Sequence, residues 1–254
     1  MLKIDTHLQI GEHHLNHCED YLLTAEIGRY IHLIAVCDGC TMGKESWFAS
    51  ALIGKLLKKI SREIHFRTLR EPQLTEDLRA LEKMILQKLF SEIKEIQQRL
   101  FLEKEELLST LILGLIDLEK RRVKVTVIGD GLVKIDEDIY DFDQDNKPDY
   151  LGLHLSEDFE EWYLNQSQVI DNQFDKAIVI STDGLFSFLP YEYRNLRKTI
   201  NSEELILKEA KLSLKQKMIY LEEEFGLKPT DDLAIISCQM LRQTKSQCPQ
   251  SPFQ

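Results

Sequence analysis

The sequence predicts an α+β fold, and two features of its hydrophobic pattern predict it. Two long stretches repeat apolar residues at every third or fourth position, which is the period of an amphipathic helix. Several shorter apolar runs have the length of a β-strand and end at Asp-Gly pairs or charged turns. One strand precedes the helical stretches and the others follow them, so strands dominate the middle of the chain.

Residues 31–36 form the first predicted strand, which ends at Cys37. The helical pattern that follows repeats every four residues and carries lysines on its other face, so we expect one side of this helix to be buried. Its apolar positions are Phe48, Leu52, Leu56, Ile60 and Ile64.

A second, longer helix is predicted with Thr75 as its N-cap, because Glu76 and Asp77 suit the positive end of the helix dipole. The two helical patterns also resemble a coiled coil, but so few repeats favour helices that face a core. The apolar positions of the second helix are Leu78, Leu81, Ile85, Leu89, Ile93, Ile96 and Leu100.

A β-hairpin is predicted after these helices. Thr110–Ile116 is an apolar run, and Val123–Ile128 alternates in the way of a half-buried strand. The charged segment Asp117–Arg122 joins the two and has the composition of a turn.

The second half of the chain mixes irregular and regular segments. Residues 136–176 are acidic, aromatic and broken by proline and glycine, which predicts a loop-rich excursion over one face. Residues 177–182 form another buried strand, 202–225 have mixed helical character, and 233–238 form the last predicted strand.

The composition is that of a soluble acidic protein. With 254 residues and 43% apolar content, the chain can bury a substantial core, and we expect one domain at 1–240 and a disordered polar tail at 241–254. No apolar run approaches the roughly 20 residues that span a bilayer, and Met1–His7 lacks the features of a secretory signal. We therefore expect a cytoplasmic monomer that does not contact the membrane.

The formal net charge of −11 argues against nucleic acid as a general partner, because an acidic surface repels phosphate backbones. The five cysteines show no disulfide framework. Cys37 and Cys40 form a single C-x-x-C without a second pair at zinc-ligand spacing, so we interpret them as structural residues.

Acidic residues recur at the ends of the predicted buried strands. Asp-Gly is a favoured hairpin dipeptide, so any one of these pairs alone is explained by turn chemistry. Together, carboxylates at neighbouring strand ends would repel one another without cations, and hard oxygen ligands suit Mg²⁺ or Mn²⁺. The pairs are Glu19-Asp20, Asp38-Gly39, Asp130-Gly131, Asp183-Gly184 and Asp231-Asp232.

The order of these motifs resembles that of the PPM-type (type 2C) serine/threonine phosphatases, and the sequence is most similar in kind to a divergent bacterial member of that family. The resemblance covers roughly residues 8–240, and each motif is short, so its weight lies in the ordered set. The matching segments are Glu19-Asp20, 35–39, Ala49-Ser50, Ser109-Thr110, 128–130, 180–184 and 231–236.

The resemblance implies a four-layer fold, in which a central antiparallel β-sandwich is flanked by helices and holds metal ions at one end. It also implies two Mn²⁺ or Mg²⁺ ions, with a third bound more weakly, and a hydroxide that bridges two of them and attacks a phosphorylated protein. The implied catalytic residues are Asp38, Asp183 and Asp231, and the implied metal-binding set is Asp20, Asp38, the Gly39 carbonyl, Asp130, Asp183 and Asp231. Glu19 and Asp232 would act through bound water.

The sequence departs from the family where the substrate phosphate binds. Many relatives place an arginine five residues before the aspartate of the Glu-Asp motif, and here that position is Leu15. Cys40 stands where some relatives carry a histidine. The candidate phosphate-binding residues that remain nearby are His13, His14, His17 and Lys44.

Two other functions stay open beside a protein phosphatase. The missing arginine is compatible with a phosphatase-like regulatory or binding domain of little or no activity. The same hydrolysis could also serve a small phosphorylated metabolite.

Overall fold

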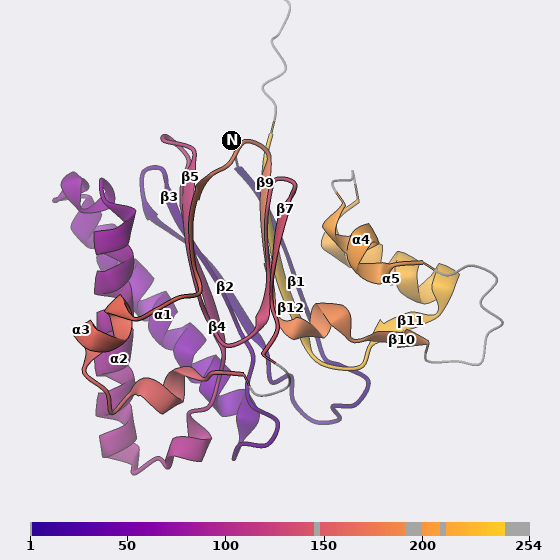
Figure 1. The fold of residues 1–254 in the computed structure, drawn as a ribbon, viewed down its shortest axis with the longest axis horizontal. Helices are drawn as coiled ribbons and strands as arrows, with labels where there is room; N and C mark the ends of the chain where they lie inside the picture. Colours follow the sequence, from indigo (N-terminus) through magenta and orange to yellow (C-terminus); the bar gives the residue numbers. More distant parts are fainter. Residues whose placement is uncertain (1, 145–147, 191–199, 209–211, 242–254) are drawn as a thin grey trace, which may run out of the picture.

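Two five-stranded antiparallel sheets form the centre of the protein (Figure 1). The structure is a computed structural model that describes residues 2–144, 148–190, 200–208 and 212–241. In one sheet the strand order is β2 (Tyr21–Gly28), β3 (Ile31–Cys37), β4 (Leu111–Asp117), β5 (Arg122–Ile128) and β8 (Val169–Gln173). In the other it is β1 (Leu2–Gln9), β12 (Leu233–Met240), β9 (Ala177–Ser181), β6 (Gly131–Ile135) and β7 (Asp138–Phe142).

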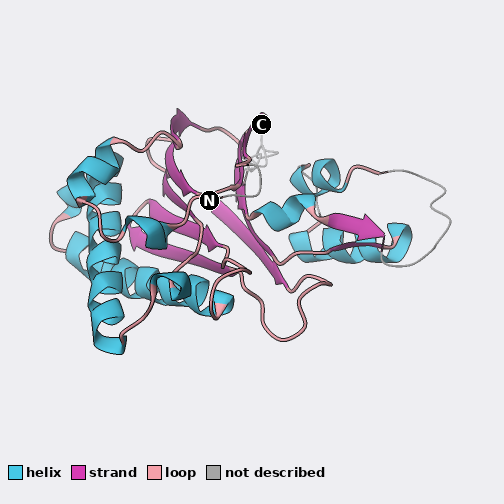
Figure 2. Cartoon of the chain, turned by 60° about the horizontal axis from the view of Figure 1, so that its bottom comes forward, coloured by secondary structure: helices cyan, strands magenta, loops and turns pink. Residues whose placement is uncertain are grey.

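Helices cover the outer face of each sheet, which gives four layers in total (Figures 1 and 2). The helices α1 (Ser46–Thr68), α2 (Leu78–Leu100) and α3 (Phe159–Leu164) lie on the side of β2–β5. The helices α4 (Ser202–Leu207) and α5 (Leu214–Phe225) lie on the other side, with the short pair β10 (Phe188–Pro190) and β11 (Leu227–Pro229). Four 3₁₀ turns complete the described elements: η1 (Pro72–Thr75), η2 (Lys104–Glu106), η3 (Leu151–His154) and η4 (Asp183–Phe186). The predicted α+β class with a flanked antiparallel sandwich is confirmed.

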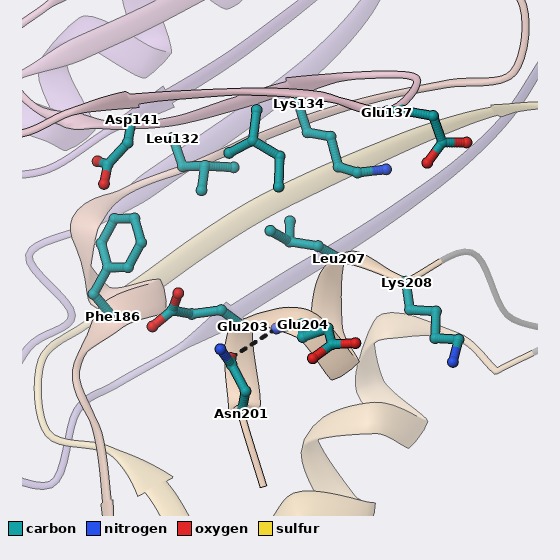
Figure 3. Close-up of a pocket in the computed structure, with 11 residues that line it drawn as sticks. Leu132, Lys134, Glu137, Asp141, Phe186, Asn201, Glu203, Glu204, Leu207 and Lys208 are labelled. Carbon is teal, nitrogen blue, oxygen red and sulfur yellow. Dashed lines mark hydrogen bonds between the residues drawn. The ribbon is translucent and has the colours of Figure 1, made fainter.

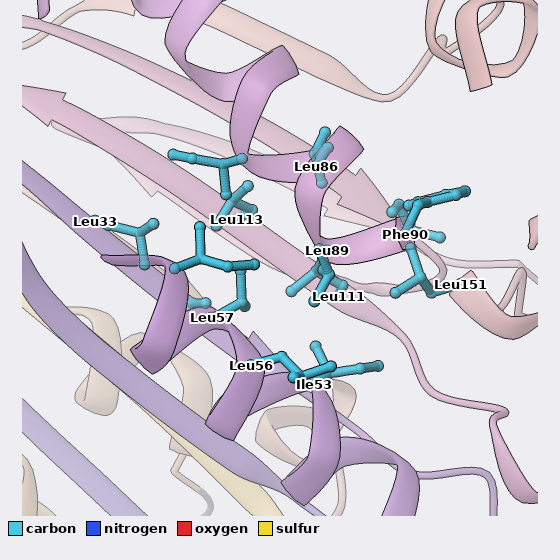
Figure 4. Packing of buried hydrophobic residues seen from close by; sticks show 14 of the residues in the cluster. Leu33, Ile53, Leu56, Leu57, Leu86, Leu89, Phe90, Leu111, Leu113 and Leu151 are labelled. Carbon is cyan, nitrogen blue, oxygen red and sulfur yellow. The ribbon is translucent and has the colours of Figure 1, made fainter. Parts of the chain in front are cut away.

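Three separate hydrophobic clusters hold the layers together. One lies between the two sheets and includes Ile34, Ile112 and Ile180. A larger cluster lies between the helices α1 and α2 and the sheet that contains β4. Leucines of both helices pack there against Leu111 and Leu113 of β4 (Figure 4). Burial of this much apolar surface is the main force that fixes the sandwich and its ends.

The N-cap of α2 is Asp77 and not Thr75. The Asp77 carboxylate accepts hydrogen bonds from the amides of Arg79 at 2.9 Å and Ala80 at 3.3 Å. Thr75 ends the preceding turn η1, and its hydroxyl donates to the carbonyl of Pro72 at 2.8 Å. The capping prediction was therefore wrong by two residues, because the chain makes one more turn before the helix begins.

The prediction of a loop-rich segment at 136–176 was only partly right. This segment contains β7, α3 and β8, in addition to the irregular parts. β7 pairs with β6 through the turn at Asp136, whose φ is 52°, and the Asp136 carboxylate accepts the amides of Asp175, Lys176 and Ala177 at 2.7–2.9 Å. Asp136 thus ties the turn between β6 and β7 to the connection between β8 and β9.

The first and last described strands are neighbours in the second sheet, where β1 pairs with β12 along its whole length. Neither β1 nor β2 was predicted from the sequence. The predicted tail at 241–254 lies, apart from Leu241, outside the described residues. No helix in the described ranges is long and apolar enough to cross a membrane.

Candidate metal centre

The strand ends that carry the acidic motifs meet at one end of the sandwich. Asp38 follows β3 and Asp130 joins β5 to β6, while Asp183 follows β9 and Asp231 precedes β12. β9 and β12 are antiparallel neighbours, with Ser181 opposite Ile235, so the end of one strand lies beside the start of the other. The fold therefore brings together the four aspartates that the sequence analysis selected.

Asp38 is held by hydrogen bonds from both sides of its own backbone. Its amide donates to the Thr110 hydroxyl at 3.1 Å, and its carbonyl accepts the Thr110 amide at 2.8 Å. The Gly39 amide donates to the Glu19 carbonyl at 3.1 Å. These bonds to two different segments fix the direction in which the Asp38 carboxylate leaves the strand.

Gly39 is required by the packing of the backbone. A Cβ atom at this position would lie 2.1 Å from the carbonyl oxygen of Ser46, the first residue of α1. No side chain fits this gap, so the dipeptide is explained by the close approach of α1 to the end of β3. The glycine is thus part of the architecture of the site, whatever its carbonyl binds.

Asp20 is 4% exposed and lies in the centre of the cluster. One carboxylate oxygen accepts the Thr182 hydroxyl at 2.7 Å, which joins the Glu-Asp segment to the end of β9. The other oxygen, Oδ1, is buried and finds no donor among the described residues. The nearby Asp38 side chain supplies no hydrogen bond when both carboxylates are ionised, because neither then carries a proton.

The pKa values of the cluster are raised, as expected for buried carboxylates that face one another. Burial, together with the charges of Asp232 and Asp183, raises the pKa of Asp20 to about 8. Burial and the charges of Asp130 and Asp231 raise the pKa of Asp183 to about 7.

The pKa of Asp38 is also raised well above its usual range, by burial and then by the charges of Asp20 and Asp183. Burial raises the pKa of Asp130, and the charges of Asp143 and Asp231 add to it. A divalent cation would reverse these shifts, because opposite charge favours the ionised form.

Asp232 has a different role from its neighbour Asp231. It is 1% exposed, and its carboxylate accepts the Gly11 amide at 2.7 Å and also the amide of Glu19. Its acceptor oxygens are thus engaged by the loop that carries the Glu-Asp motif. The Asp231 side chain, in contrast, is 45% exposed and faces a cavity.

This cavity has a volume of about 430 Å³ and is lined mainly by carboxylates and aromatic rings. Asp130, Asp183 and Asp231 lie in its wall. Asp141 and Asp143 also line it, and the sequence analysis missed both. The only signal for them was the alternation Asp-Phe-Asp at the end of β7, in a segment interpreted as a loop.

The candidate phosphate-binding residues separate clearly in space. Nδ1 of His14 lies 3.0 Å from Asp232, and its Nε2 lies 3.8 Å from Asp231. His13 is exposed, and the ring of His17 packs against Trp47 with 5.0 Å between the ring centres. Lys44 forms an ion pair with Glu103. His14 is therefore the candidate that lies directly at the carboxylate cluster.

Burial alone would lower the pKa of His14, but the adjacent carboxylate of Asp232 and the charges of Glu19 and Asp231 outweigh that effect and raise it. Leu15, at the position of the missing arginine, is 89% exposed. The outer carboxylate Glu19 accepts the Thr41 hydroxyl at 2.9 Å. Cys37 and Cys40 are buried free thiols, and burial raises the pKa of Cys37, so it is not a reactive thiolate.

The donor set fits a hard divalent cation. All of its side-chain ligand atoms are carboxylate oxygens, and the orphaned Oδ1 of Asp20 is a buried acceptor without a donor. Within the described ranges, no three His, Cys, Asp or Glu side chains are close enough together to form a finished cation site. The fold thus gathers the carboxylates at one end of the sandwich without bringing them to the distances of a finished cation site.

Comparisons with known proteins identify the fold and the family. The chain has the fold of a bacterial serine phosphatase (14% identity, TM-score 0.60, covering 95% of this chain and 98% of the other). It is equally similar to the serine/threonine phosphatase of S. agalactiae (13% identity, TM-score 0.60, 95% and 100% covered). RsbX, solved in complex with magnesium, also shares the fold (15% identity, TM-score 0.56, 94% and 96% covered).

No curated protein matches the sequence. The family model described as protein phosphatase 2C does match, over residues 10–218, which span all of the acidic motifs except Asp231-Asp232. The chain belongs to the protein phosphatase 2C family.

Proposed function

We propose that this protein is a Mg²⁺- or Mn²⁺-dependent phosphatase that hydrolyses phosphoserine or phosphothreonine in proteins. The observation that carries the proposal is the buried cluster of Asp20, Asp38 and Asp183, whose raised pKa values and orphaned oxygen call for cations. We further propose that it works in the cytoplasm as a monomer, without nucleic-acid or membrane partners.

Asp38, the Gly39 carbonyl, Asp183 and Asp231 would hold two cations, and Asp130 would contribute to a third. Asp20 would complete this set, and Glu19 and Asp232 would support it through water. When bound, such ions favour the ionisation of a water nucleophile and neutralise the charge that develops on the phosphoryl group.

The remaining work falls to the protein's own groups. Thr110 and the Glu19 carbonyl hold the Asp38 segment in one orientation, so little reorganisation is needed when ligands arrive. The Asp232 carboxylate accepts the backbone amide of Glu19 and so holds Glu19 in place. His14, beside Asp231, is the group that we propose to bind the substrate phosphate in place of the missing arginine.

A phosphatase-like binding domain is the second candidate, and Leu15 supports it. This side chain projects into solvent where many relatives have a phosphate-binding cation, and Lys44 is engaged by Glu103. If His14 does not replace the arginine, the protein would keep the fold but hydrolyse phosphate esters slowly or not at all, as a regulatory or binding domain. A metabolite phosphatase is the third candidate, and only substrate comparison separates it from the first.

The test is hydrolysis of para-nitrophenyl phosphate with Mn²⁺, Mg²⁺ or EDTA, and then of phosphoserine peptides and small phosphate esters. Asp38→Ala and Asp183→Ala should each lower kcat/KM by at least about 100-fold, since loss of even supporting groups at metal sites costs 10- to 100-fold. Asp171→Ala, an exposed aspartate on β8, is the matched control and should keep full activity.

Absence of turnover with either metal, from protein that is folded by circular dichroism, would make the binding domain the leading candidate. Turnover of small esters with none of the phosphopeptides would identify a metabolite phosphatase.

A further inference from the structure

A second cavity opens directly beside the metal centre. It has a volume of about 480 Å³ and lies between the outer face of the β6–β7 hairpin and the helix α4 (Figure 3). Asp141 and Phe186 line both this cavity and the acidic one. The two cavities are therefore adjacent, and we call the second one the β7–α4 groove.

The floor of the β7–α4 groove is built from two cross-strand pairs. Leu132 lies opposite Asp141, and Lys134 lies opposite Ile139, with all four side chains on the outer face of the sheet. Residues of α4 and its N-cap Asn201 form the facing wall. The groove follows β7, whose five residues at about 3.3 Å each could align with three or four residues of an extended peptide.

The end of the groove that meets the metal centre is acidic and partly apolar. Asp141, Phe186 and Glu203 gather there, and Glu204 follows along α4 (Figure 3). In the described part of the chain, the carboxylates of Asp141, Glu203 and Glu204 take part in no ion pair. Among the described residues these three charges thus have no cationic partner, and Lys208 is a further charged residue of the lining.

The far end of the groove is closer to neutral. Glu137 there pairs with Lys176 at 2.7 Å, and the ammonium group of Lys134 donates to the Asp136 carbonyl. Ile139 is 54% exposed and Phe186 is 39% exposed, so the groove also offers uncovered apolar surface. A peptide that matches this lining carries basic side chains near its phosphorylated residue, and the aliphatic parts of those side chains cover the exposed apolar surface.

We propose that the β7–α4 groove binds a basic, extended segment of the protein substrate, on one side of the phosphorylated residue. Lysine or arginine side chains would meet Asp141, Glu203 and Glu204, and their aliphatic stems would lie on Ile139 and Phe186. This inference rests on the proposed function, and it adds a preference that the metal cluster alone would not create, because the cluster contacts only the phosphate.

The test compares phosphoserine peptides of equal length, with two arginines before the phosphoserine, two after it, or two glutamines in either place. Each kcat/KM is divided by the value for para-nitrophenyl phosphate with the same enzyme variant. One arginine placement should exceed its glutamine counterpart by about three- to tenfold, as expected for two solvent-exposed charge pairs. The preference should fall as the salt concentration rises.

The double variant E203Q/E204Q should remove most of this preference. E223Q/E224Q changes the same charge on the exposed side of α5 and is the matched control, which should keep the preference. Equal values for arginine and glutamine peptides in both placements would overturn the inference. An equal loss of preference in both double variants would also overturn it, since net charge would then be the cause.

A binding measurement separates this inference from the proposed function. Fluorescence anisotropy with a labelled arginine peptide, in Mn²⁺ or in EDTA, needs no hydrolysis. Binding that E203Q/E204Q weakens, by a protein without turnover, would support the groove and reject the phosphatase. Turnover with no peptide preference would reject the groove and leave the phosphatase standing.

Discussion

Asp20 and Asp232 are both aspartates with almost no exposed surface, yet their surroundings are opposite. Asp232 receives backbone amides from Gly11 and Glu19, so its negative charge is stabilised by donors that the fold supplies. Asp20 receives a single hydroxyl from Thr182, and other carboxylates surround the rest of it. The first charge is satisfied by the protein, and the second is not.

The difference indicates which carboxylates stabilise the fold through hydrogen bonds and which are candidates to bind a cation. A buried ionised group is stable only when hydrogen bonds or an opposite charge compensate its lost hydration. Asp232 has that compensation in the protein alone. The cluster around Asp20 obtains it from cations or, in their absence, takes up protons, as its raised pKa values show. Metal binding and the stability of this end of the sandwich should therefore be coupled.

The largest effect is expected for Asp232→Ala. This change leaves the buried amide of Gly11 and the partly buried amide of Glu19 without acceptors, at a cost of about 3 kcal/mol in the free energy of unfolding. Urea denaturation in EDTA measures it. Asp231→Ala is the matched control and should cost less than about 1 kcal/mol, because this neighbouring side chain is half exposed. Similar losses for both variants would contradict the distinction between the two aspartates.

A smaller effect of opposite sign is expected for Asp20→Asn. The amide needs no cation and can donate to Asp38, so the metal-free protein should gain about 1–3 kcal/mol in unfolding free energy. The same change should weaken Mn²⁺ binding by about 10- to 100-fold. Urea denaturation in EDTA and calorimetric titration with Mn²⁺ give the two values. A loss of stability in EDTA would show that the Asp20 charge is compensated within the protein.

The smallest effect on unfolding free energy is expected for His154→Gln, because a protonated histidine is the third kind of group that stabilises a carboxylate in this protein. His154 lies 2.7 Å from Asp149 and 2.8 Å from Glu157, and the hydrogen bond to Asp149 is the main cause that raises its pKa. A raised pKa means that this stabilisation is complete below pH 6.5 and is lost as the pH rises through the folded value. His154→Gln should therefore cost more at pH 6 than at pH 9, by less than about 1 kcal/mol at this partly exposed site.

Urea denaturation of both proteins at the two pH values tests this, and an equal cost at each pH would mean that the His154 charge contributes nothing.

The sequence predicted best the elements whose pattern is set by burial on one face. The apolar runs of β3, β4, β9 and β12 lie in the core, and so do most of the predicted apolar positions of α1 and α2. Phe48, Leu52 and Ile96 are only half-buried, and Leu100, near the end of α2, is 60% exposed. β1, β7 and β8 escaped prediction because they are edge strands, largely exposed or half-exposed, that exist through their pairing. The partner of β1 is more than 200 residues away in the sequence, so no local sequence pattern predicts this pairing.

The acidic motifs were found because they follow buried strands, which the sequence shows. What the sequence does not show is the direction of each side chain. Asp231 and Asp232 are adjacent, yet one faces the cavity and the other faces a loop. For the same reason the sequence could not single out His14, rather than His13 or His17, as the histidine beside the cluster. Asp141 lies at the cavity because of the register between β6 and β7, which the sequence did not predict.

The pairing of β1 with β12 has a consequence for the order of events during synthesis. The loop that carries Glu19 and Asp20 is fastened by Asp232, and β1 finds its partner strand only when residues 233–240 have left the ribosome. Helices α1 and α2 can pack early, on contacts close in sequence. The carboxylate cluster is therefore among the last parts of the nascent chain to assemble.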